Sequence, residues 1–218
     1  MTINETIVDR NITEVVHFTT HTGLLGSLHA RAVKSRQRLP AEVDLELIYK
    51  PNAQWRKDTE WLDYVNLSIS RINADFFLSS CRWHRAEDLW WCVLAFDPAI
   101  LTHPGVVFTT TNNMYSGVCR APGADGFDQL FSPYTTRWSG NVVTRSPDLP
   151  DAFTTCIQAE ALYPKELSIQ YLRRVYVVRE DDQDEVCAQL HMIGIEGVDV
   201  TVAPSKFNET EVGHAAKR

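Results

Sequence analysis

The run from Leu89 to Phe96 constrains the fold most, because every residue in it is apolar or aromatic (LWWCVLAF). A strand is continuously apolar when protein covers both of its faces. The Asp97-Pro98 pair ends the run, since proline is excluded from the interior of a central strand. The run therefore predicts a central strand that is buried on both sides.

The segment from Tyr64 to Ser70 shows the clearest alternation of apolar and polar side chains (YVNLSIS). In a strand, Val65, Leu67 and Ile69 share one buried face, and the polar residues share the other. That polar face fits either the wall of a binding cleft or an exposed sheet surface, and the pattern favours neither. Further strands are expected at Ile12–Phe18, Val106–Thr110, Tyr171–Val178 and Val198–Val202.

Helices are expected between these strands. Thr20 or Thr22 can cap a helix directly after the first strand. The residues expected on its apolar face are Leu24, Leu25 and Leu28. A later short helix carries Val186 and Leu190. With 218 residues, 44% of them hydrophobic, the chain is long enough for one substantial core. We expect a single α+β or α/β domain over residues 1–218, with a core from about residue 12 to 207 and frayed ends.

The residues from Tyr115 to Pro150 are rich in Gly, Pro, Ser and Thr, with one helix-like patch at Gly126–Phe131. A long irregular segment in a compact domain is more often a functional loop than a plain connection. The net charge of −7 argues against binding nucleic acid through bulk electrostatics, so any such contact must be local. The residues of this segment that suit such a contact are Arg120, Arg137, Arg145, Tyr134 and Trp138.

Several classes of protein are disfavoured by the motifs that the sequence lacks. The five cysteines include no C-x-x-C pair, which predicts reduced thiols in a cytoplasm rather than disulfides or a zinc site. The N-terminus has no apolar signal-peptide region, and no run is long enough to span a bilayer, so we expect no membrane association. The histidines form no zinc pattern, and both phosphate-binding glycine motifs are absent. We therefore expect no metal.

The segment from Phe153 to Pro164 carries Gln158 and Glu160 on a short apolar run. If this run is a strand, the two side chains project from one face. A carboxylate beside an amide suits chemistry in which a cation develops on a sugar carbon, because the carboxylate stabilises the charge or takes a proton. An edge strand with two solvated polar residues is the simpler explanation and is favoured by this pattern alone.

Three blocks in this order resemble the DarT family of DNA ADP-ribosyltransferase toxins. They are His17-Phe18-Thr19, Asp63 to Ile69, and Gln158-Ala159-Glu160. The resemblance extends over roughly Val15 to Phe207. It implies an α+β ADP-ribosyltransferase fold, in which two small bent antiparallel sheets surround an NAD cleft and helices lie outside. It also implies a reaction in which ADP-ribose passes from NAD to a base of single-stranded DNA.

The resemblance assigns roles to individual residues. Glu160 is the catalytic carboxylate, and the family's essential arginine is best matched by Arg56. The residues implied in binding NAD are His17, Phe18, Thr19, Ser68, Asn73 and Phe76. Two of these have a purely structural alternative, since His17 can pack under the following helix and Phe76 can be a core residue.

Gln158 and Arg145 are implied to contact the acceptor, with the segment from Tyr115 to Phe153 as the loop that recognises it. The Asn66-Leu67-Ser68 sequence departs from many relatives, which leaves thymine and guanine both open as the modified base. The implied partners are single-stranded DNA and a macrodomain antitoxin. An RNA-directed enzyme and an inactive nucleotide-binding relative are the alternatives.

Overall fold

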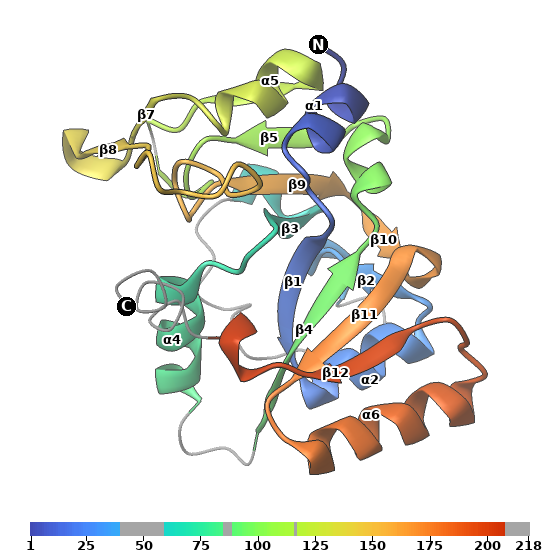
Figure 1. Cartoon of the computed structure of the whole chain (residues 1–218). Helices are drawn as coiled ribbons and strands as arrows, with labels where there is room; N and C mark the ends of the chain where they lie inside the picture. Colours follow the sequence, from blue (N-terminus) through green and yellow to red (C-terminus); the bar gives the residue numbers. More distant parts are fainter. Residues whose placement is uncertain (40–58, 85–88, 116, 208–218) are drawn as a thin grey trace.

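The computed structural model describes residues 1–39, 59–84, 89–115 and 117–207 (Figure 1). Within that part of the chain, the apolar run forms β4 (Trp91–Phe96), which lies between β1 (Val15–Thr20) and β11 (Leu172–Val177) and pairs antiparallel with both. Alternate residues of β4 enter two different hydrophobic clusters. The prediction of a central strand covered on both sides is therefore confirmed.

β4 belongs to an eight-stranded sheet with the order β12-β11-β4-β1-β3-β9-β5-β6. The remaining strands of this sheet are β3 (Tyr64–Ile69), β5 (Val107–Thr109), β6 (Arg120–Pro122), β9 (Glu160–Pro164) and β12 (Asp199–Val202). In Figure 1, β5 and β9 run across the upper half of the molecule, whereas β1, β4 and β11 run steeply through the lower half. The sheet thus turns sharply between its two halves.

β3 joins these two halves. The end of β3 pairs with the beginning of β1 through Val15↔Ile69 and Val16↔Ser68, while the first residues of β3 pair with β9. Beyond Val16, the described pairs of β1 are all with β4. The two small sheets implied by the resemblance are two parts of one sheet, because both include β3.

Helices cover both faces of the lower half. α2 (His21–His29) and α6 (Glu180–Ile193) share the hydrophobic cluster on one side, and α4 (Ala74–Trp83) contributes Phe77 to the cluster on the other. The helix residues buried as expected are Leu24, Leu28, Val186 and Leu190. Leu25 is 41% exposed instead, because consecutive residues of a helix lie about 100° apart around its axis.

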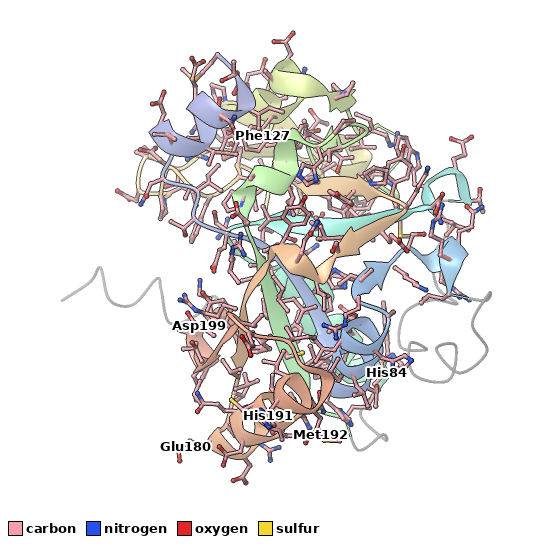
Figure 2. All side chains as sticks on the ribbon, turned by 90° about the vertical axis from the view of Figure 1, so that its right-hand side faces the viewer. His84, Phe127, Glu180, His191, Met192 and Asp199 are labelled. Atoms are coloured by element: carbon pink, nitrogen blue, oxygen red, sulfur yellow. The ribbon has the colours of Figure 1, made fainter. Side chains whose placement is uncertain are left out.

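α1 (Ile3–Asp9) and α5 (Gly123–Gln129) lie together at the other end of the molecule. The hydroxyl of Thr6 donates to the carboxylate of Asp128 at 2.9 Å, so ordered structure begins before the expected core. Figure 2 shows Phe127 of α5 at this end and α6 at the opposite end. The α6 residues labelled there are Glu180, His191 and Met192. No helix in the described ranges is long and apolar enough to cross a membrane.

The segment from Tyr115 to Pro150 is more ordered than the expected loop. It contains β6, α5 and an antiparallel hairpin of β7 (Tyr134–Thr136) and β8 (Val142–Thr144). A second small pairing joins β2 (Ala32–Lys34) to β10 (Glu166–Ser168). The short 3-10 helices are η1 (Arg36–Arg38), η3 (Thr59–Trp61), η4 (Pro98–Thr102), η5 (Trp138–Gly140), η6 (Ile169–Tyr171) and η7 (Pro204–Lys206).

The strand expected from Phe153 to Pro164 begins only at Glu160. The residues before it form turns, in which Thr154 Oγ1 donates to the carbonyl oxygen of Cys156 at 2.8 Å. Such side-chain bonds to nearby backbone compete with strand pairing. Gln158 therefore precedes the strand, so the arrangement in which Gln158 and Glu160 project from one strand face is not found. Cys156 itself is buried.

Candidate active site

A cavity of about 230 Å³ opens where β1 and β3 diverge. Its walls come from β1, β3, the beginning of α2, β2, α4 and the residues that follow β5. The predicted site residues that the structure brings together here are His17, Phe18, Thr19, Ser68, Asn73, Phe76 and Glu160. The polar face of β3 forms part of this wall, which favours the cleft over an exposed sheet surface.

Both oxygens of the Glu160 carboxylate accept a hydrogen bond. The side-chain amide of Asn66 on β3 donates to Oε1 at 3.0 Å, and the backbone N–H of Asn113, after β5, donates to Oε2 at 2.8 Å. Glu160 itself is the first residue of β9 and pairs with Thr109 of β5. Because its donors come from different segments, the carboxylate has a fixed orientation at the cavity wall.

The His17 ring forms a hydrogen bond with the backbone of Asn66 on β3. Its Nδ1 lies 2.9 Å from the carbonyl oxygen of Asn66, and a carbonyl oxygen only accepts, so Nδ1 carries the hydrogen. The neutral ring then carries its lone pair on Nε2. Burial of the ring lowers the pKa of His17 below its ordinary value of 6.5, although the bond to Asn66 acts in the opposite direction. His17 is therefore a neutral side chain with an acceptor nitrogen.

Aromatic rings form another wall of the cavity. Phe18 lies with its ring centroid 5.6 Å from that of Phe76 and 5.9 Å from that of Trp91. Asn73 caps α4, because its side-chain oxygen accepts from the N–H of Phe76 at 3.2 Å. Phe76 is 37% exposed whereas Phe77 is 6% exposed. Of the two phenylalanines, Phe77 is the core residue, and Phe76 faces the cavity.

Lys34 and Arg36 supply positive charge to the cavity wall. Their segment is held against β3 by Asp63, which accepts from Arg38 Nε at 2.8 Å and from Ser35 Oγ at 2.8 Å. The hydrogen bond from Arg38 is the main reason that the pKa of Asp63 lies below its ordinary value. Asp63, from the second of the three sequence blocks, therefore positions this basic wall rather than lining the cavity.

Comparison with known proteins decides the family. The model of the family described as DarT, ssDNA thymidine ADP-ribosyltransferase, matches residues 16–208. The chain belongs to the DarT family. The expected family and class of enzyme are thereby confirmed. None of the curated protein sequences compared with the chain matches it.

Solved DarT structures confirm the fold. Thermus sp. 2.9 DarT in complex with carba-NAD⁺ is 14% identical, covers 90% of this chain and 98% of that chain, and gives a TM-score of 0.63. The same protein in complex with ADP-ribosylated ssDNA gives 13% identity, coverages of 91% and 97%, and a TM-score of 0.63. Thermosipho africanus DarTG in complex with ADP-ribose is 13% identical and gives coverages of 89% and 51% and a TM-score of 0.56.

Two of the remaining residues implied by the DarT resemblance, Gln158 and Arg145, do not line the cavity. Gln158 accepts from Arg137 Nε at 3.3 Å in the turn before β9. The Arg145 guanidinium donates to the carbonyl oxygens of Phe153 at 2.6 Å and Pro150 at 3.0 Å, so it holds backbone rather than projecting freely. Arg56 lies outside the described residues.

Asn66 and Asn113 hold the Glu160 carboxylate, and the sequence did not single them out as site residues. Asn66 belongs to the polar face of the Tyr64–Ser70 strand, so the alternation placed it on the correct side. Asn113 lies in the connection between β5 and β6. Its contribution is a backbone N–H, which carries no signature of residue type.

In the described ranges, no group of three or more His, Cys, Asp or Glu side chains is suited to hold a metal ion.

Gly23 lies against the site, and its replacement by alanine is expected to impair NAD binding. A Cβ at this position would overlap Thr19 Oγ1 and lie 3.3 Å from Thr20 Oγ1. Displacing the Thr19 hydroxyl alters the cavity wall, and overpacking of this kind costs about 1–3 kcal/mol. We expect the KM for NAD to rise while folding is retained.

Gly126→Ala is the matched control, because its Cβ would overlap the carbonyl oxygen of Ala121, away from the cavity. This variant is expected to lose stability in urea denaturation but to keep its KM for NAD. A Gly23→Ala enzyme with an unchanged KM would show that Thr19 does not contact the nucleotide.

Proposed function

We propose that this chain transfers ADP-ribose from NAD to a thymine base of single-stranded DNA. The observation that carries the proposal is the Glu160 carboxylate, held at both oxygens in a cavity with one basic and one aromatic wall. The family description names thymidine, and the solved relatives include complexes with NAD⁺ and with ADP-ribosylated ssDNA.

The walls of the cavity suggest how NAD lies in it. Lys34 and Arg36 suit the diphosphate, because charged donors bind phosphate oxygens most strongly. Phe18 and Phe76 suit a flat ring, which stacks on or against an aromatic face. The Nε2 of His17 suits an amide N–H of the nicotinamide, with Thr19 beside it.

Glu160 acts on the charge that develops during transfer. The bond from ribose C1 to the nicotinamide nitrogen breaks, its electrons leave with nicotinamide, and C1 becomes oxocarbenium-like. A nitrogen of the base then bonds to C1 and loses its proton. A fixed carboxylate stabilises the cation and takes up that proton, and each of these effects is commonly worth about a hundredfold or more in rate.

The DNA strand is proposed to approach along Gln158 and the β7–β8 hairpin. Arg137 contacts Gln158, and the hairpin presents Trp138, which is 57% exposed, and Tyr134, which is 66% exposed. Exposed aromatic rings beside arginine suit the bases and phosphates of a single strand. Arg145 is assigned a supporting role, because its bonds to Pro150 and Phe153 shape the segment that leads to Gln158.

We further propose that the protein is a cytoplasmic toxin neutralised by a macrodomain antitoxin. The support is membership of the DarT family together with the similarity to Thermosipho africanus DarTG, of which this chain matches 51%. Such an enzyme modifies DNA inside the cell that makes it, so an uncontrolled copy is expected to stop growth.

The test is the mass of an oligonucleotide after incubation with the protein and NAD. A single-stranded oligonucleotide that contains thymine is expected to gain the mass of one ADP-ribose. The same sequence with its thymines replaced, its duplex form and its RNA counterpart are expected to stay unmodified. A mass gain on RNA alone would favour the RNA-directed alternative, and no gain on any polymer would favour an inactive relative.

A further inference from the structure

A chain of hydrogen bonds connects Arg120 to the proposed catalytic carboxylate. Arg120 is on β6, and its guanidinium donates from Nε to Asn113 Oδ1 at 2.7 Å and from Nη2 to the carbonyl oxygen of Asn113 at 2.6 Å. The N–H of Asn113 in turn donates to Glu160 Oε2 at 2.8 Å. Arg120 therefore contacts the residue that holds Glu160.

The geometry points to Arg120 as a positioning residue that fixes the Asn113 N–H toward Glu160. Asn113 is buried, but it lies in the connection between β5 and β6 rather than in a strand. A loop N–H orients a carboxylate only if the loop itself is held. Arg120 provides this restraint by binding both the side-chain oxygen and the backbone carbonyl oxygen of Asn113.

The shape of the guanidinium explains why arginine suits this position. Its planar fork presents two N–H groups in fixed relative directions, whereas the ammonium of lysine is a single rotating donor group. The guanidinium carbon also lies 5.5 Å from the centre of the Trp61 ring, and Trp61 in turn contacts Tyr64 of the cavity wall. Arg120, which the sequence suggested as a phosphate contact, is thus already engaged within the protein.

This inference rests on the proposed function, because it concerns the orientation of Glu160 during transfer. Losing one direct donor to a reacting charge commonly costs about 100- to 1,000-fold in kcat. Arg120 acts through Asn113 and leaves the N–H present, so we expect a smaller loss, of about tenfold in kcat. The KM for NAD is expected to change by less than about twofold, because interactions realised mainly in the transition state alter kcat.

The experiment compares Arg120→Met, Arg120→Lys and Arg173→Met as full-length proteins. Arg173 is the control, because it is exposed and pairs with Asp97 at 3.0 Å, away from the cavity. Rates are measured on a thymine-containing single strand over a range of NAD concentrations, with urea denaturation of each protein. The expected result is a lower kcat for Arg120→Met, an intermediate kcat for Arg120→Lys, and wild-type behaviour for Arg173→Met.

The outcomes separate this inference from the function itself. If Arg120→Met keeps a kcat within twofold of Arg173→Met, or if only its KM for NAD rises, Arg120 does not position Glu160. Should Arg120→Met fail to fold, the charge-retaining Arg120→Lys decides on the same readout, and a wild-type kcat in that variant overturns the inference. A wild-type protein that transfers no ADP-ribose refutes the proposed function instead.

Discussion

Glu160→Gln is expected to lower the rate of ADP-ribose transfer to single-stranded DNA by about a hundredfold or more. Glutamine has nearly the same shape, but its neutral amide neither stabilises an oxocarbenium-like carbon nor takes up a proton. It also offers one oxygen where the carboxylate offers two, so either Asn66 or the Asn113 N–H loses its acceptor. The rate is measured at saturating NAD by the mass of the modified oligonucleotide.

Glu185→Gln is the matched control for this substitution. Glu185 is an exposed residue of α6 that accepts from Gln189 at 3.0 Å, and α6 does not line the cavity. This variant is expected to transfer ADP-ribose at the wild-type rate.

Expression of Glu160→Gln is expected to be tolerated by cells in which the wild-type chain stops growth. Equal rates for the two variants would remove Glu160 from the catalytic role.

The strands of this fold were predictable wherever burial leaves a strong pattern. The apolar run gives β4, and the alternation of Val65, Leu67 and Ile69 gives β3, whose three apolar residues are all buried. The pairing between strands was not predictable, because register depends on contacts between distant segments. That β3 pairs with β1 at one end and β9 at the other explains why two expected sheets are one.

In the site, too, features with a local sequence pattern were predictable, whereas features that depend on contacts between distant segments were not. Glu160, His17, Phe18 and Phe76, which the resemblance assigned to the site, line one cavity. The short apolar run did not reveal that Gln158 precedes the strand, in a turn region where Thr154 Oγ1 donates to the carbonyl oxygen of Cys156. Asn113 was missed because a backbone N–H has no residue signature.

His17→Asn is expected to raise the KM for NAD about tenfold, whereas His17→Gln is expected to retain part of the affinity. The amide of asparagine reaches about as far as Nδ1 and keeps a donor for the Asn66 carbonyl, but nothing replaces Nε2. Glutamine reaches toward the position of Nε2 and offers an acceptor there. If the two variants bind NAD equally well in calorimetry, His17 serves only to join β1 to β3.

The pH dependence of the stability of the wild-type protein gives a second test of whether the His17 ring is neutral. Burial lowers the pKa of folded His17 below 6.5, so the unfolded chain binds more protons between the folded pKa and 6.5. The contribution of His17 to the free energy of unfolding therefore has its full value above pH 6.5. It declines as the pH falls toward the pKa of the folded state. His17→Asn lacks this titration, so urea midpoints of the wild type should fall more steeply on acidification than those of the variant.

The affinity of the wild type for NAD should also weaken as the pH approaches the folded pKa of His17, because a protonated ring has no acceptor nitrogen. Parallel midpoints for the two proteins would mean that the His17 ring titrates alike in the folded and unfolded chain.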